Sequence, residues 1–395
     1  MIPSRAAPKL RKAGFSLQSR QMRAWIFQIL ALACIAFAMW WLLSNTLANM
    51  KARGIQSGFD FLMQPAGFDI GEDWINYDSN NPYWKAFLVG LVNTLRVAII
   101  GIVLTTILGT LLGVGRFSRN ALIRGICYCY VEFFRNIPVL LQLLMWYLIF
   151  TEYFPQVTEA IRVGDWLFLS KNGISFPTPK WELGHTLAVA GLGIGSVIGI
   201  VYARLAAKVF DTTGKPQPVV WIIAALVIGF ALLGWLMGGA PTGLNMPVLT
   251  ETQVEGGGAL TPEYLAVLIG LVLYTSAFVA EVVRAGISSV SLGQHEASAS
   301  LGLSRGQSMR LVLLPQALRV IIPPMTNQFL NLTKNSSLAV AVGYPDVVSI
   351  SNTSLNQTGR AVECICIIML IYLTTSLVTS GFMNWFNKRA AIKER

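Results

Sequence analysis

Polar side chains recur within an apolar segment near the carboxyl end of the sequence. A spacing of i, i+4 and i+7 would place three of them on one face of a helix, with a fourth beside them. The four residues are Asn327, Gln328, Asn331 and Lys334. Amides donate and accept hydrogen bonds, and an ammonium donates them, so this polar stripe could line a path or pocket for a polar, zwitterionic solute. Alternatively, the same side chains hydrogen-bond neighbouring helices.

Two prolines, Pro323 and Pro324, stand directly before the polar stripe. They are expected to break the helix, because each lacks a backbone N–H. Irregular backbone inside a membrane is tolerated only where it is buried in protein or lines a cavity. The prolines therefore favour the path over simple helix packing.

A second polar set, Glu132, Arg135 and Gln142, recurs at intervals of three and seven and is expected on one helical face. Glu132 and Arg135 could neutralise each other, and Pro138 predicts a kink. Polar groups at membrane depth are costly, so each is expected to face protein or water. This set either contributes to a solute path or fixes its helix against a neighbour.

Residues 296–315, EASASLGLSRGQSMRLVLLP, predict two short helices joined by an elbow. Gly302 can adopt the left-handed conformation that ends the first helix. Ser304 and Gln307 form a capping box that starts the second. On its own, the segment could be an ordinary helix–turn–helix connector.

The sequence predicts no catalytic residue, metal site or cofactor. The Gly–Lys pair at 214 and 215 is followed by proline and lacks the upstream glycine of a phosphate-binding loop. His185 and His295 are far apart in sequence. Alternate residues of a helix point about 200° apart, so the two C-x-C pairs make poor metal sites. We interpret the cysteines as buried small apolar residues: Cys34, Cys127, Cys129, Cys364 and Cys366.

Composition indicates an all-α integral membrane protein. The 395 residues are 54% hydrophobic and 12% charged, about half the usual charged fraction. Apolar runs long enough to cross a bilayer predict eight spans. They cover about residues 25–44, 85–115, 122–150, 184–204, 219–238, 262–284, 312–333 and 361–386.

Basic residues gather in alternate connections and at both ends of the chain, which predicts that both termini are cytoplasmic. The net charge of +11 then reflects topology, and no soluble segment is large enough for a nucleic-acid interface. The apolar run 25–43 is longer than the core of a signal peptide, so we expect an uncleaved anchor helix.

The segments between the spans differ in character. Residues 45–84 contain two near-copies, GFDF at 58–61 and GFDI at 67–70. They could form an amphipathic lid or a contact for a soluble binding protein, or simply a solvated loop with anchoring Phe side chains. Residues 151–183 and 239–261 are interpreted as connectors. The Gly-rich run 191–199 favours close packing of a helix pair.

Several motifs together resemble the polar amino-acid permeases of ABC importers. The elbow resembles their EAA loop, with Ser298 in place of the usual Ala and Val312 in place of Ile. Matching motifs are GLVNTL at 90–95, EFFRNIP at 132–138 and KNSSL at 334–338. The resemblance covers about residues 85–386. The long loop and the extra helix pair look most like the larger permease subunit of broad-specificity L-amino-acid systems.

The resemblance implies a type I importer fold with a five-helix core, an N-terminal helix and an inserted helix pair at about 184–238. The expected division is 1–84 for the basic tail, first helix and periplasmic loop, 85–387 for the permease domain, and 388–395 for a cytoplasmic tail. Six residues are expected to couple the chain to an ATPase: Glu296, Ala297, Ser298, Gly302, Leu303 and Pro315.

The implied function is import of polar L-amino acids across the cytoplasmic (inner) membrane, driven by ATP hydrolysis on partner subunits. The implied partners are ABC ATPase subunits, a second related permease forming a heterodimer, a periplasmic amino-acid-binding protein and the lipid bilayer. The alternative is a secondary transporter driven by protons through Glu132 or Glu363. A membrane-embedded enzyme would need a catalytic set that the sequence does not show.

Overall fold

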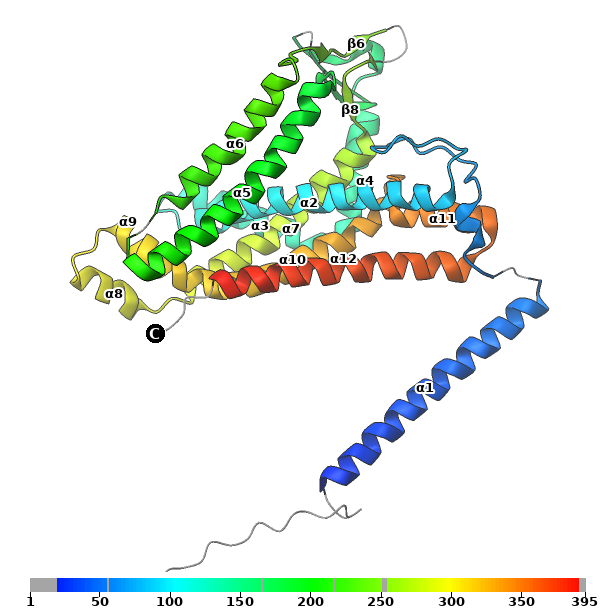
Figure 1. Ribbon diagram of the computed structural model, residues 1–395, viewed down its shortest axis with the longest axis horizontal. Helices are drawn as coiled ribbons and strands as arrows, with labels where there is room; N and C mark the ends of the chain where they lie inside the picture. Colours follow the sequence, from blue (N-terminus) through cyan, green and yellow to red (C-terminus); the bar gives the residue numbers. More distant parts are fainter. Residues whose placement is uncertain (1–19, 55–56, 165, 216, 251–253, 391–395) are drawn as a thin grey trace, which may run out of the picture.

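The computed structural model describes residues 20–54, 57–164, 166–215, 217–250 and 254–390. The basic segment 1–19 and the last five residues of the expected cytoplasmic tail lie outside these ranges. Figure 1 shows a bundle of long helices with short strands at its upper end, α8 and α9 at the left, and α1 set apart from the bundle. We call the side that carries α8 and α9 the elbow end.

Six described helices are long and apolar enough to cross a membrane. They are α1 (Arg20–Ala52), α2 (Tyr83–Gly115), α5 (Leu183–Thr213), α6 (Val219–Met237), α7 (Pro262–Ser288) and α12 (Ala361–Ala390). The expected span 122–150 is a broken pair, α3 (Ala121–Asn136) and α4 (Val139–Leu148), which continues as the π-helix η2 (Ile149–Tyr153). The pair bends by 103°. Counting this pair as one span gives up to seven, so the count of eight is not confirmed.

The remaining expected span, 312–333, forms α10 (Leu314–Asn335). It is not among the six helices that are apolar enough to cross a membrane, and its polar stripe lowers its hydropathy. The expectation that Pro323 and Pro324 break this helix is wrong, because both lie inside a continuous α10. A proline already has a helical φ, and the buried side of α10, which includes Ile322 and Met325, holds the helix in place.

Helix α7 is the centre of the bundle. It packs along α2, α3, α4 and α10, and most of its residues are buried. One apolar cluster joins Val97 of α2, Leu143 of α4 and Leu271 of α7. After α10, the chain continues through the 3-10 helix η5 (Ser336–Val342) and the short helix α11 (Val347–Thr358) into α12.

Helices α5 and α6 pack mainly on each other, as Figure 1 shows for this inclined pair. A Cβ on Gly191 would lie 2.2 Å from the carbonyl oxygen of Phe230, so only glycine allows this approach. The close packing expected from the Gly-rich run is therefore present.

Short strands occupy the two segments that were interpreted as connectors. A four-stranded antiparallel sheet has the order β1-β2-β3-β8, formed by Ile161–Val163, Leu167–Ser170, Gly173–Phe176 and Gly258–Leu260. Two further pairs join β4 (Thr178–Pro179) to β5 (Leu244–Asn245) and β6 (Val248–Leu249) to β7 (Val254–Glu255). Strand β8 leads directly into α7, so the sheet is attached to the central helix.

Candidate functional site

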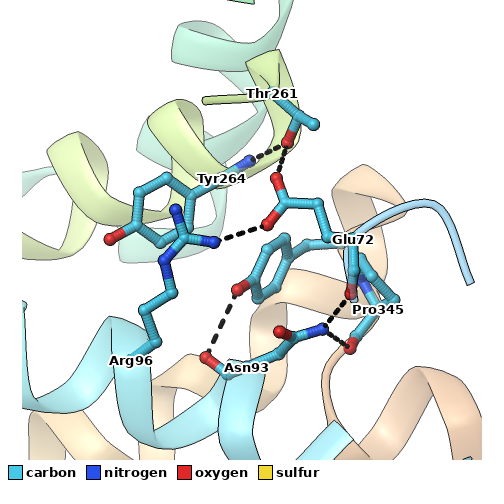
Figure 2. Close-up of polar contacts among 7 residues, drawn as sticks. Glu72, Asn93, Arg96, Thr261, Tyr264 and Pro345 are labelled. Carbon is cyan, nitrogen blue, oxygen red and sulfur yellow. Dashed lines mark hydrogen bonds and ion pairs between the residues drawn. The ribbon is translucent and has the colours of Figure 1, made fainter. Parts of the chain in front are cut away.

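A buried ion pair holds the segment before α2 against the bundle. Arg96 of α2 donates from Nη1 to Oε2 of Glu72 at 2.9 Å. The hydroxyl of Thr261, the N-cap residue of α7, donates to the other oxygen of Glu72. Figure 2 shows this carboxylate between α2 and the start of α7.

Aromatic rings enclose the guanidinium of Arg96. Its Cζ lies 3.8 Å from the ring centroid of Tyr264 and 4.4 Å from that of Trp74. A cation gains energy over such faces, more so where water is excluded. Burial raises the pKa of the Glu72 carboxyl, an effect opposed by the hydrogen bond from Thr261 and the charge of Arg96.

Asn93 holds two backbone carbonyl groups beside this ion pair. The side-chain amide of Asn93 donates to the carbonyl oxygens of Glu72, at 2.9 Å, and Pro345, at 3.0 Å. Figure 2 shows these two bonds converging on one nitrogen. The segment before α2 is thereby joined to the turn before α11. Sequence reasoning missed this cluster, although an arginine within the apolar run of α2 is the signal that could have found it.

A second clamp holds the other end of the same segment. Arg360, in the turn before α12, donates to the carbonyl oxygen of Gly58 at 2.9 Å and pairs with Asp60 at 3.0 Å. The N–H of Gly58 donates to Glu363 at 2.6 Å. We call residues 57–82 the clamped loop.

The near-copies of the clamped loop are packed rather than free. Phe61, which ends the first copy and lies in the 3-10 helix η1 (Asp60–Met63), is buried. Phe68 of the second packs at 6.1 Å from Tyr83, measured between ring centroids. Phe59 and Trp74 stay exposed. The description of anchoring Phe side chains therefore fits part of the loop.

The break between α3 and α4 is held by Gln142. Its amide donates to the carbonyl oxygens of Phe134, at 3.0 Å, and Ile137, at 2.9 Å, and its side chain is buried. These carbonyls lose helical partners at the bend, and an unsatisfied polar group in an apolar setting is costly. The expectation that Gln142 shares a helical face with Glu132 and Arg135 is wrong, because the bend separates them.

Arg135 pairs with Glu281 of α7, at 3.9 Å between Nη1 and Oε2, and not with Glu132, which its spacing along the helix also allowed. Glu281 also accepts from Arg116, at the end of α2, at 2.5 Å and from Arg284 on its own helix. Three guanidinium groups therefore surround one carboxylate, which joins α2, α3 and α7 toward the elbow end.

The polar stripe of α10 points away from the rest of the subunit. Asn327, Asn331 and Lys334 are exposed and Gln328 is half-buried. On the opposite side of the helix, Phe329 and Leu332 are buried. The structure therefore brings these four residues together on one face of α10.

The elbow has the predicted geometry. Helix α8 (Leu292–Ser300) ends before Gly302, whose φ is +70°. Ser304 N donates to Oε1 of Gln307 at 2.9 Å, and Gln307 N donates to Oγ of Ser304 at 3.3 Å. This capping box begins α9 (Arg305–Ser308), which is followed by the π-helix η4 (Met309–Leu313).

The side-chain contact of Ser298 explains why a serine stands in place of the usual alanine. Ser298 is buried, and its hydroxyl lies 2.6 Å from the hydroxyl of Ser308, so it joins α8 to α9. Glu296 and Ala297 are exposed, whereas Leu303 and Pro315 are partly buried. The six predicted coupling residues thus lie in one compact elbow and at the start of α10.

The cysteines fit the expectation only in part. Cys127 and Cys364 are buried, but Cys34, Cys129 and Cys366 are exposed on helices. The expectation is wrong for these three, because their helix faces do not contact the rest of the subunit.

The fold and these clusters define a multi-span helical membrane protein with an exposed elbow and a polar helix face. Residues 191–392 match the family described as "Binding-protein-dependent transport system inner membrane component". The general L-amino acid transport system permease protein AapQ of Rhizobium johnstonii is 43% identical over 390 residues, which are 98% of this chain and 98% of the relative.

Two more relatives cover nearly the whole chain. The putative amino-acid ABC transporter permease protein YhdX of Escherichia coli is 43% identical over 385 residues, 97% of this chain and 98% of the relative. The glutamate/glutamine/aspartate/asparagine transport system permease protein BztB of Rhodobacter capsulatus is 40% identical over 422 residues, 97% of this chain and 98% of the relative.

The chain belongs to the family of inner membrane components of binding-protein-dependent transport systems. It is a multi-pass permease subunit of an ABC importer and a transport component rather than an enzyme. Family membership implies an ATPase and a soluble substrate-binding protein as partners.

Proposed function

We propose that this permease carries polar L-amino acids into the cell, along a path that includes the exposed polar stripe of α10. The observation that carries the proposal is the position of Asn327, Asn331 and Lys334 on the open side of a helix whose other side is packed. Polar side chains at membrane depth need protein or water around them. The amino-acid systems named for AapQ, YhdX and BztB support the substrate class.

A second, related permease subunit supplies the other wall of the path. Within one subunit the polar stripe would face lipid, and a partner helix placed opposite it would remove that cost. We infer a heterodimer, in which the partner is a distinct chain. Glu132 and Arg135 belong to the same proposed path, whereas the hydrogen bonds of Gln142 support a role in holding the α3–α4 break.

The elbow couples this path to the ATPase. Glu296, Ala297 and Leu301 of the elbow are exposed, and Leu301 is 79% exposed, so an apolar cleft on the ATPase could cover it. The elbow leads through η4 into α10 without an intervening loop. A movement of α9 would therefore reach the polar stripe through one continuous helical segment, and the contact between Ser298 and Ser308 links α8 to α9.

Orientation and domain division follow from this assignment. We place the elbow end and both termini in the cytoplasm and the clamped loop outside, in agreement with the distribution of basic residues. Residues 85–387 would form the permease domain, and the α5–α6 pair an insertion at its periphery. The self-contained packing of this pair supports that division.

Transport by the reconstituted complex tests the proposal. Vesicles containing the permease, its second permease and the ATPase, with binding protein on the opposite side, should take up glutamine only when ATP is present on the elbow side. A protonophore should leave this uptake unchanged. Uptake that continues without ATP and stops with the protonophore would establish a secondary transporter instead.

A further inference from the structure

Lys334 is the charged member of the polar stripe. It lies in the last turn of α10 and is exposed. It follows Asn327 by seven residues, which is about 10 Å along a helix. Under the proposed orientation, Lys334 therefore stands at the outer end of the path.

The ammonium of Lys334 has no partner within the described part of the subunit. Its backbone carbonyl accepts from the hydroxyl of Ser337 at 2.7 Å, but no ion pair or side-chain hydrogen bond of Lys334 is present there. Two arginines, one within α2 and one at its end, differ in this respect. Arg96 is paired with Glu72, and Arg116 with Glu281.

An unpaired cation at this position needs a counter-charge or water, because a desolvated ammonium is costly. Every amino acid carries an α-carboxylate, and acidic amino acids carry a second one. The other three residues of the stripe are uncharged amides. Within the stripe, a substrate therefore meets a positive electrostatic potential.

We propose that Lys334 binds the carboxylate of the entering amino acid and makes the path select acidic and neutral amino acids over cationic ones. This inference rests on the proposed function. The α-carboxylate gives every substrate one attraction to the ammonium, an acidic side chain adds another, and a cationic side chain is repelled. The effect strengthens where the path excludes water.

Competition assays on the reconstituted complex with its partners test this assignment. The variants are Lys334→Gln, which removes the charge, and Lys334→Arg, which keeps it. Lys85→Gln is the matched control. Lys85 is also a lysine and lies in the first turn of α2, directly after the clamped loop, but it donates to Asn81 at 2.8 Å. The measurement is inhibition of labelled glutamine uptake by glutamate and by arginine.

Lys334→Gln should lower the preference for glutamate over arginine by about tenfold, equivalent to about 1.4 kcal/mol. Lys334→Arg and Lys85→Gln should keep the wild-type ranking. An unchanged ranking in Lys334→Gln would overturn the proposal.

Equal loss of all substrates in Lys334→Gln, with weaker co-purification of the second permease, would also overturn it and assign Lys334 to the subunit interface. Absence of ATP-driven amino-acid uptake in the wild-type complex would instead reject the proposed function itself. The two failures are therefore distinguishable.

Discussion

The carboxylate of Glu72 lies 2.9 Å from the guanidinium of Arg96, although one belongs to the clamped loop and the other to α2. Both side chains are nearly inaccessible to solvent, at 8% and 10% exposure. Removing one partner of a buried ion pair leaves the other charge uncompensated, which is far more costly than losing an exposed pair. The stability of the clamped loop should therefore depend on this pair.

Glu72→Gln should destabilise the permease by about 3 kcal/mol, because it keeps the side-chain volume and leaves Arg96 buried without its anion. Thermal unfolding in detergent measures the change. Asp78→Asn is the control: it removes an exposed charge from the same loop and keeps the oxygen that accepts from Asn80. Similar melting temperatures for the two variants would contradict a stabilising role for the pair.

Gln142→Leu should lower stability by about 1–3 kcal/mol, because two partly buried carbonyls at the α3–α4 break lose their donor. Gln156→Leu, a change at an exposed position after η2, is the control and should have little effect. The measurement is again thermal unfolding, combined with glutamine uptake. A wild-type melting temperature for Gln142→Leu would show that the break does not need this side chain.

Gly302→Asp should abolish transport and weaken co-purification of the ATPase while leaving membrane insertion intact. A residue with a Cβ strains the left-handed backbone of Gly302 by about 1–2 kcal/mol, and aspartate adds a charge to the docking elbow. Space is not the cause, since nothing lies within 4 Å of the added Cβ.

Gly302→Asn is the matched variant for this prediction, because asparagine tolerates the left-handed conformation and carries no charge. It should retain more transport than Gly302→Asp. Normal uptake by Gly302→Asp at wild-type protein levels would reject the assignment of the elbow to ATPase coupling.

Gln328→Glu should shift selectivity toward cationic amino acids, because it places a carboxylate on the polar stripe. Inhibition of glutamine uptake by arginine and by glutamate measures the shift, and a tenfold change corresponds to about 1.4 kcal/mol. Gln64→Glu, in the clamped loop, is the control. If the ranking of competitors stays the same while stability falls, the stripe serves helix packing instead.

The elbow could be predicted in detail because its geometry is local. A glycine at a helix end and a Ser–x–x–Gln box act within a few residues, and both appear as expected at Gly302, Ser304 and Gln307. The apolar runs likewise predicted the long helices. The number of spans could not be predicted in the same way, because a bent pair and a polar helix do not follow the hydropathy of ordinary spans.

The ion pair of Glu72 with Arg96 could not be predicted in the same way, because its two residues meet only when the clamped loop folds back on α2. The short strands were missed since two to four residues show no clear alternation. Pro138 predicted a kink, but a bend of 103° also depends on the packing of α4 against α7. These features depend on tertiary contacts rather than on local propensity.

The Arg360 clamp constrains the order in which this protein can fold during its synthesis. Gly58 and Asp60 leave the ribosome 302 and 300 residues before their partner, and synthesis proceeds from the amino end. Under the proposed orientation, the clamped loop therefore stays outside the membrane without its partner until Arg360 and the final helix have been made. This clamp can therefore close only after every intervening helix has been synthesised. Chains truncated before Arg360 would leave the loop unclamped and accessible to quality-control proteases.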